Sequence, residues 1–127
     1  MLLDTHVVLW LLEDDPRLGP EARASLTEAI AVHVSAASLW EIAIKQSVGK
    51  LTVPDDLPAR VEAAGLRWLP LGADHVWATR TVEGLPHRNP FDRLLVAQAL
   101  VEGLPLLTAD RALLGAPLEA DLLDARR

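Results

Sequence analysis

Four acidic residues stand where apolar segments end or where helices are expected to begin. They are Asp4, Glu41, Asp92 and Asp110, and they are the chain's best candidates for chemistry. The chain has no cysteine, and its four histidines show no spacing typical of metal ligands. Oxygen donors without thiolates suit hard divalent cations such as Mg²⁺ or Mn²⁺. The pattern therefore favours metal-assisted chemistry on a phosphate ester.

Each of these acids also has a purely structural interpretation. Ser38 and Glu41 have the spacing of a capping box, in which the glutamate accepts a hydrogen bond from a free backbone N–H. Asp92 ends an Asn-Pro-Phe-Asp segment typical of a helix start, where an acid is favoured by the helix dipole. Asp4 and Asp110 could cap the segments that follow them. The residues alone leave the catalytic and the structural interpretations evenly balanced.

The elements that must position these acids alternate along the chain. Short apolar runs predict strands near 1–4, 31–35, 66–71 and 104–107. Caps, breakers and apolar periodicity predict helices near 6–13, 20–30, 38–48, 55–64, 73–82 and 91–102. This alternation predicts a single domain over residues 1–127, a three-layer α/β/α fold around a short, mostly parallel central sheet.

A parallel sheet would bring the acids together. Asp4 directly follows Leu2-Leu3, and Asp110 closely follows Leu106-Leu107. Ligands bind at the carboxyl ends of strands in such sheets, so both acids are expected on one rim. Glu41 and Asp92 are expected in the first turns of helices that could start from that rim. Four carboxylates this close are stable only with a cation or bound protons.

Composition limits the other classes of function. The chain has 127 residues, half of them hydrophobic, which is enough for one core. No run approaches the roughly 18 apolar residues of a membrane span, and no basic leader starts the chain, so we expect a cytoplasmic protein without a membrane partner. The net charge of −6 argues against a simple nucleic-acid binder. It does not exclude a nuclease, because a bound cation neutralises its carboxylates.

Four sequence blocks carry a family resemblance: LLDTHVVLW at 2–10, SLWEIAIK at 38–45, HRNPFDRLL at 87–95 and LTAD at 107–110. They resemble the signature blocks of PIN-domain ribonucleases, and most of all the VapC-type toxins of bacterial type II toxin–antitoxin pairs. The blocks follow the family's order over nearly the whole chain. One position departs, because Asn89 stands where relatives often have Asp. Asparagine is an equally good N-cap, so only a secondary contribution to metal binding would be lost.

The resemblance implies a Mg²⁺- or Mn²⁺-dependent endoribonuclease that hydrolyses RNA and, as a toxin, inhibits translation and growth. Carried over by position, Asp4, Glu41, Asp92 and Asp110 would be the catalytic, metal-binding acids. Asp4 and Asp92 would be direct ligands, and Asp110 could act through water. The resemblance also implies a homodimer and a cognate antitoxin that wraps a segment over the toxin.

Several neighbours of the acids could support them. Thr5 and Thr108 could orient a metal-bound water, or could make ordinary turn or cap hydrogen bonds. Arg93 could contact RNA phosphate or pair with an acid. Lys45 follows Glu41 by four residues, a spacing that predicts an ion pair on one helix face.

The aromatic residues and one histidine allow further interpretations. Trp10 and Trp40 lie in apolar helical faces, which favours burial in the core or in an interface over stacking on RNA bases. His87 lies in the loop before Asp92 and is the histidine that could touch a substrate.

Two rival functions can be weighed from the same residues. A phosphatase with Asp4 as nucleophile would carry a second acid two residues later, and His6 stands there instead. A non-catalytic PIN-like module would serve only for binding or regulation. Retention of all four acids argues against such decay.

Overall fold

One parallel sheet organises the fold. The computed structural model describes residues 1–127 and pairs five strands in the order β3-β2-β1-β4-β5. Every pairing is parallel, and β1 lies at the centre between β2 and β4. The strands are β1 (Leu2–Leu3), β2 (His33–Ser35), β3 (Arg67–Leu69), β4 (Leu106–Thr108) and β5 (Leu122–Asp124). The predicted α/β class is confirmed, and the sheet is parallel throughout rather than mostly so.

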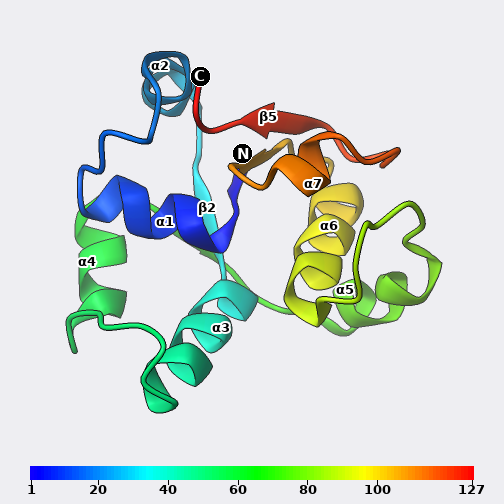
Figure 1. The fold of residues 1–127 in the computed structure, drawn as a ribbon, viewed down its shortest axis with the longest axis horizontal. Coiled ribbons are helices and arrows are strands. Elements are labelled where there is room, and N and C mark those ends of the chain that lie inside the picture. The colour runs from blue at the N-terminus through cyan, green and yellow to red at the C-terminus, as the bar shows by residue number, and fades with distance from the viewer.

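Helices cover both faces of this sheet. Figure 1 shows α1 and α4 to the left of the central strands and α5 and α6 to their right. None of the helices combines the length and the apolar character needed to cross a membrane. The helices are α1 (Thr5–Leu12), α2 (Pro20–Glu28), α3 (Ala36–Ser47), α4 (Leu57–Ala63), α5 (Ala73–Ala78), α6 (Pro90–Glu102) and α7 (Arg111–Leu114), with a 3-10 turn η1 at Thr79–Thr81.

The core is divided by the alternation of side chains along the strands. Leu2 of β1 packs in a cluster with Leu95 and Val96 of α6. The next residue, Leu3, packs in a second cluster with Val7 of α1. Successive strand residues point to opposite faces, so a two-residue strand can join both layers. Burial of each such leucine contributes about 1.5–3 kcal/mol, which explains how so short a strand holds the centre of the sheet.

Helix α3 begins two residues earlier than its sequence pattern suggests. Its N-cap is Ser35, whose Oγ accepts a hydrogen bond from the backbone N–H of Ala37 at 3.0 Å. Ser38 therefore lies inside the helix, and Glu41 lies in its second turn. The predicted capping box of Ser38 with Glu41 is wrong, because the end of β2 places a different serine at the cap.

Helix α6 begins and ends where its local residues dictate. The Oδ1 atom of Asn89 accepts from the backbone N–H of Phe91 at 3.0 Å, and Pro90 takes the first helical position. Gly103 closes the helix in the left-handed region at φ 65°. This start places Asp92 in the first turn, as predicted.

The last residues of the chain lie against the start of α2. The backbone N–H of Gly19 donates to the carbonyl of Ala125 at 2.9 Å, and that of Glu21 donates to Arg127 at 2.7 Å. A Cβ atom on Gly19 would lie 2.3 Å from the carbonyl carbon of Arg127. The close approach of two backbones therefore requires glycine at this position.

Candidate active site

All four predicted acids line one cavity of about 350 Å³. Asp4, Glu41 and Asp92 are buried, with exposed fractions of 5%, 4% and 7%, and Asp110 is half-buried. The cavity lies at the carboxyl ends of β1 and β4. These neighbouring strands form the topological switch point of the sheet, because β2 and β3 follow on one side and β5 on the other. The structure thus brings the acids together, and their role as metal ligands stays a prediction.

Asp4 is held by two donors at the end of β1. Its Oδ1 accepts from the backbone N–H of Thr5 at 2.7 Å, and its Oδ2 accepts from the Thr108 hydroxyl at 2.7 Å. The same Thr108 oxygen accepts from the backbone N–H of Asp110 at 3.1 Å. Thr108 therefore ties two of the acids to each other. Asp4 is both the cap of α1 and a member of the acidic cluster. The capping interpretation of this residue is therefore compatible with a role in the cavity.

Glu41 reaches the cavity from the second turn of α3. The Thr5 hydroxyl donates to its Oε1 at 2.7 Å, and the Ser38 hydroxyl lies 3.0 Å from that of Thr5. The Lys45 ammonium lies 2.6 Å from Glu41 Oε2, which is the ion pair expected from the spacing. These contacts fix both carboxylate oxygens.

Asp92 and Asp110 line another side of the cavity, and a histidine next to the cavity lies close to both of them. His87 Nε2 lies 3.0 Å from Asp92 Oδ2 and 3.8 Å from Asp110 Oδ2. Asp110 Oδ1 accepts from the backbone N–H of Ala112 at 2.9 Å and so caps α7. As in Asp4, one carboxylate oxygen of Asp110 caps a helix and the other faces the acidic cluster.

The cluster disfavours its own negative charge. Burial, together with the nearby carboxylates of Asp4, Glu41 and Asp110, raises the pKa of Asp92 to about 7, although His87 opposes the shift. Burial also raises the pKa of Asp4, against the hydrogen bonds from Thr108 and Thr5. Buried carboxylates of this kind gain most from a positive charge placed between them. An oxygen-rich donor set without sulfur fits a hard divalent cation.

Three basic residues, here called the rim, also line the cavity. Arg17, Lys45 and Arg126 line it together with the acids. The guanidinium carbons of Arg17 and Arg126 lie 4.9 Å and 5.8 Å from the ring centroid of Trp10, which is buried beneath them. Cations above carboxylates suit a substrate that carries phosphate. Sequence analysis missed Arg17 and Arg126, because no local pattern links a turn after α1 to the end of the chain.

Arg93 does not line the cavity, contrary to its predicted supporting role. Its Nη1 donates to the carbonyls of Thr79 and Val82, both at 2.9 Å, and so fixes the segment before the His87 loop. Trp40 also differs from expectation, since its side chain is 55% exposed and packs edge-on against Phe91 at 5.2 Å. Burial of Trp40 in the core is therefore wrong, and its burial in an interface stays a prediction.

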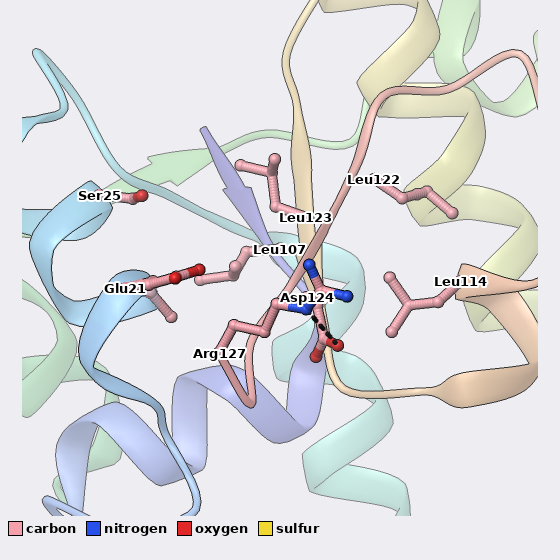
Figure 2. Close-up of a pocket in the computed structure, with 9 residues that line it drawn as sticks. Glu21, Ser25, Leu107, Leu114, Leu122, Leu123, Asp124 and Arg127 are labelled. Atoms are coloured by element: carbon pink, nitrogen blue, oxygen red, sulfur yellow. Dashed lines mark ion pairs between the residues drawn. The ribbon is translucent and has the colours of Figure 1, made fainter.

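A second cavity, of about 410 Å³, lies apart from the acids. Figure 2 shows it between α2, which supplies Glu21 and Ser25, and Leu114 of α7, with the β5 strand crossing it. Leucines form much of its wall, and its one ion pair joins Arg127 to Asp124 at 3.8 Å. Its residues offer no convergent set of catalytic groups.

Comparisons with known proteins agree on one family. The sequence model of the PIN domain matches residues 1–116. Ribonuclease VapC22 of Mycobacterium tuberculosis (strain ATCC 25618 / H37Rv) is 31% identical, over 89% of this chain and 88% of the relative.

Solved structures share the fold. A chain in the crystal structure of VapBC2 from Rickettsia felis, bound to a DNA fragment from their promoter, matches with a TM-score of 0.69 and 15% identity. A chain in the DNA-bound VapBC structure from Salmonella typhimurium matches with a TM-score of 0.69 and 18% identity. Each match covers 97% of this chain and 96% of the other.

Proposed function

The chain belongs to the PIN-domain family, and from this premise we propose that it is a divalent-metal-dependent endoribonuclease, the toxin of a toxin–antitoxin pair. The observation that carries the proposal is one cavity lined by four carboxylates and three cationic side chains. The relative named as a ribonuclease supports the choice of RNA as the substrate.

The acids would hold Mg²⁺ or Mn²⁺, with Asp4 and Asp92 as direct ligands and Glu41 and Asp110 completing the site. When bound, such a cation activates a water for attack on phosphorus and stabilises the leaving oxygen. The chain's own groups do the rest. The hydroxyl of Thr108 and its counterpart on Thr5 hold the carboxylates in place.

The rim would bind the RNA backbone. Arg17, Lys45 and Arg126 line the cavity and can donate to phosphate oxygens. Their contacts would align the scissile phosphodiester with the acids. We also propose a cytoplasmic location for the protein, which suits an RNA substrate.

The partner would be an antitoxin, as in the VapBC complexes that share the fold. Trp40 and Ile44 on α3 and Val48 at its C-cap are all exposed and recur every four residues, so they form one apolar stripe. Lys45 of the same helix lines the cavity. A partner that covered this stripe would also reach the acids. We further propose a homodimer.

The test is cleavage of a labelled, structured RNA pool by the purified chain in Mg²⁺, Mn²⁺ or EDTA. We expect cleavage that requires the metal and falls by at least about a hundredfold in Asp92→Asn, because the variant loses a ligand of the cation. Asp121→Asn makes the same change of charge at an exposed position away from the cavity and should cleave like wild type.

Each contrary outcome identifies a rival. Cleavage that persists in EDTA or in Asp92→Asn would contradict the metal-dependent mechanism. Folded protein that binds RNA without cutting it would favour the non-catalytic module. Release of phosphate from small esters would favour the phosphatase with Asp4 as nucleophile.

A further inference from the structure

His87 lies among the acids, and the proposed function so far gives it no role. The residue belongs to the loop between η1 and α6, and its side chain is 34% exposed. One ligand atom each from His87, Asp92 and Asp110 can be chosen so that all three lie within 4.8 Å of one another. By proximity alone, the imidazole could be a third metal ligand.

The second ring nitrogen of His87 argues against that role. The backbone N–H of Asn89 donates to His87 Nδ1 at 3.2 Å. A nitrogen that accepts a hydrogen bond carries no proton, so this contact favours the tautomer of His87 with its proton on Nε2. A histidine that binds a metal shows the opposite arrangement, with its remote N–H donating to an acceptor. In His87 the remote nitrogen faces a donor instead.

The donor that sets this tautomer belongs to a well-fixed part of the chain. Asn89 is the N-cap of α6, and its side chain bonds the backbone of Phe91. The beginning of the loop is fixed by Arg93, which donates to the carbonyls of Thr79 and Val82. The contacts at the two ends of the loop therefore help to hold His87 Nε2 beside the carboxylates of Asp92 and Asp110.

We propose that His87 is a substrate-binding residue, whose Nε2–H donates to a phosphate oxygen of the RNA, and that it does not bind the metal. The inference rests on the proposed ribonuclease function. In the metal-free chain the Nε2–H is directed at Asp92. If Asp92 binds the cation, the His87 Nε2–H can donate instead to a phosphate oxygen held beside the acids. Arginine and lysine on the rim hold the flanking backbone, and His87 contacts the phosphate nearest the acids.

Two variants and a control separate the possible roles of His87. His87→Ala removes the donor, and His87→Gln restores one, because the amide nitrogen of Gln reaches about as far as Nε2. His33→Ala is the control, since the polar contact of the His33 ring is with the carbonyl of Met1 and the residue lies outside the cavity. The measurements are KM and kcat on the labelled RNA, and Mn²⁺ affinity by electron paramagnetic resonance.

We expect Mn²⁺ affinity to stay within about twofold of wild type in all three variants. The KM for RNA should rise about tenfold in His87→Ala, the loss typical of one hydrogen bond to a charged group, and should largely recover in His87→Gln. A tenfold loss of Mn²⁺ affinity in His87→Ala would overturn the proposal by making the imidazole a ligand. Unchanged KM in an active His87→Ala would overturn it by removing the contact.

A measurement that needs no ribonuclease activity reports on the tautomer. Long-range ¹H–¹⁵N correlation of the imidazole rings should show His87 with its proton on Nε2, both without metal and with Mg²⁺. A proton on Nδ1 would overturn the inference. A wild-type chain that neither binds nor cuts RNA would overturn the proposed function and this inference together, whereas an active wild type with an insensitive His87 would overturn the inference alone.

Discussion

Asp92 is the residue whose environment most resists its charge. Its side chain is nearly buried, and the carboxylates of Asp4, Glu41 and Asp110 surround it. In the unfolded chain an aspartate has a pKa of about 3.9. In the folded chain, burial and these neighbours raise the pKa of Asp92 to about 7. In the absence of a cation, folding therefore makes ionisation of Asp92 less favourable.

The stability of the metal-free protein should depend on pH accordingly. The folded state holds the Asp92 proton more tightly than the unfolded state, so this residue's contribution to stability falls as pH rises from about 4 to about 7, then levels off. Asp92→Asn should remove that part of the slope and be more stable than wild type at pH 8, by at most about 4 kcal/mol. Urea unfolding in EDTA at pH 5, 6, 7 and 8 measures the difference.

The control for this prediction is the cation itself. Saturating Mg²⁺ should stabilise wild type at pH 8 much more than Asp92→Asn, because the ion binds the folded acids. Parallel stability curves for the two proteins in EDTA would show that the charge of Asp92 does not oppose folding.

The residue types correctly predicted which acids form the cluster, but they predicted the local contacts of these acids and of their neighbours less well. Asp4 and Asp110 each cap a helix and face the cavity, so a capping pattern was never an argument against a site. Arg93 was assigned to RNA or an acid only because it adjoins Asp92 in sequence. On α6, adjacent residues point about 100° apart, and the guanidinium turns to the carbonyls of η1 and Val82.

At the scale of elements, the contact between the chain's last residues and α2 controls the rim. Arg126 donates from Nη1 to the carbonyl of Ala109 at 2.7 Å, which holds it beside the acids. Its backbone is held in turn by the approach of residues 125–127 to Gly19. Packing far from the carboxylates therefore sets the position of a cation that lines the cavity.

Gly19→Ala should consequently damage both stability and substrate binding. The φ of Gly19 is an ordinary −75°, so alanine is allowed locally, but its Cβ would require the backbone of Arg126 and Arg127 to move. We expect a loss of about 1–3 kcal/mol and a severalfold rise in KM for RNA. Urea unfolding and cleavage kinetics measure the two effects.

Gly103→Ala is the matched comparison for Gly19→Ala. Gly103 has a φ of 65°, and a Cβ there would have no atom within 4 Å. Its cost is conformational, about 1–2 kcal/mol, and should leave KM unchanged. If both variants lost stability but kept the wild-type KM for RNA, the last residues of the chain would not position the rim.

The sequence predicted those elements that carry their own signals. Helix α6 has Asn89, Pro90 and Gly103 as punctuation, and β1 is an apolar run ended by an acid. Strand β5 has no such signal, because three half-buried residues become a strand only by pairing with β4. The start of α3 was misplaced for a similar reason, since the end of β2 decides which of two serines is the cap.

At the scale of the whole molecule, the net charge of −6 hides an uneven distribution. Arg17, Lys45 and Arg126 gather at one cavity, whose acids would be neutralised by a cation. Binding of RNA should depend on this local arrangement and not on the total charge. Arg17 and Arg60 allow a direct comparison, because each is more than half exposed and ion-paired with one aspartate.

Arg17→Gln should weaken RNA binding, and Arg60→Gln should not. Both variants change the net charge equally, but only Arg17 lines the cavity. The Arg17 side chain is 65% exposed, so the guanidinium can exchange its contact with Asp15 for one with a phosphate oxygen. We expect a KM about three- to tenfold higher and a slope of log affinity against log salt that is smaller by about 0.7. Equal effects of the two variants would mean that RNA responds only to total charge.

The hydrogen bond from Thr108 to Asp4 has a consequence for biosynthesis, because it joins residues 104 positions apart. The centre of the sheet needs both ends of this interval, since β1 pairs with β4. A chain still emerging from the ribosome would present Asp4 early but could not close the cavity until Asp110 had followed. The complete set of acids can therefore assemble only after the whole interval from Asp4 to Asp110 has been synthesised.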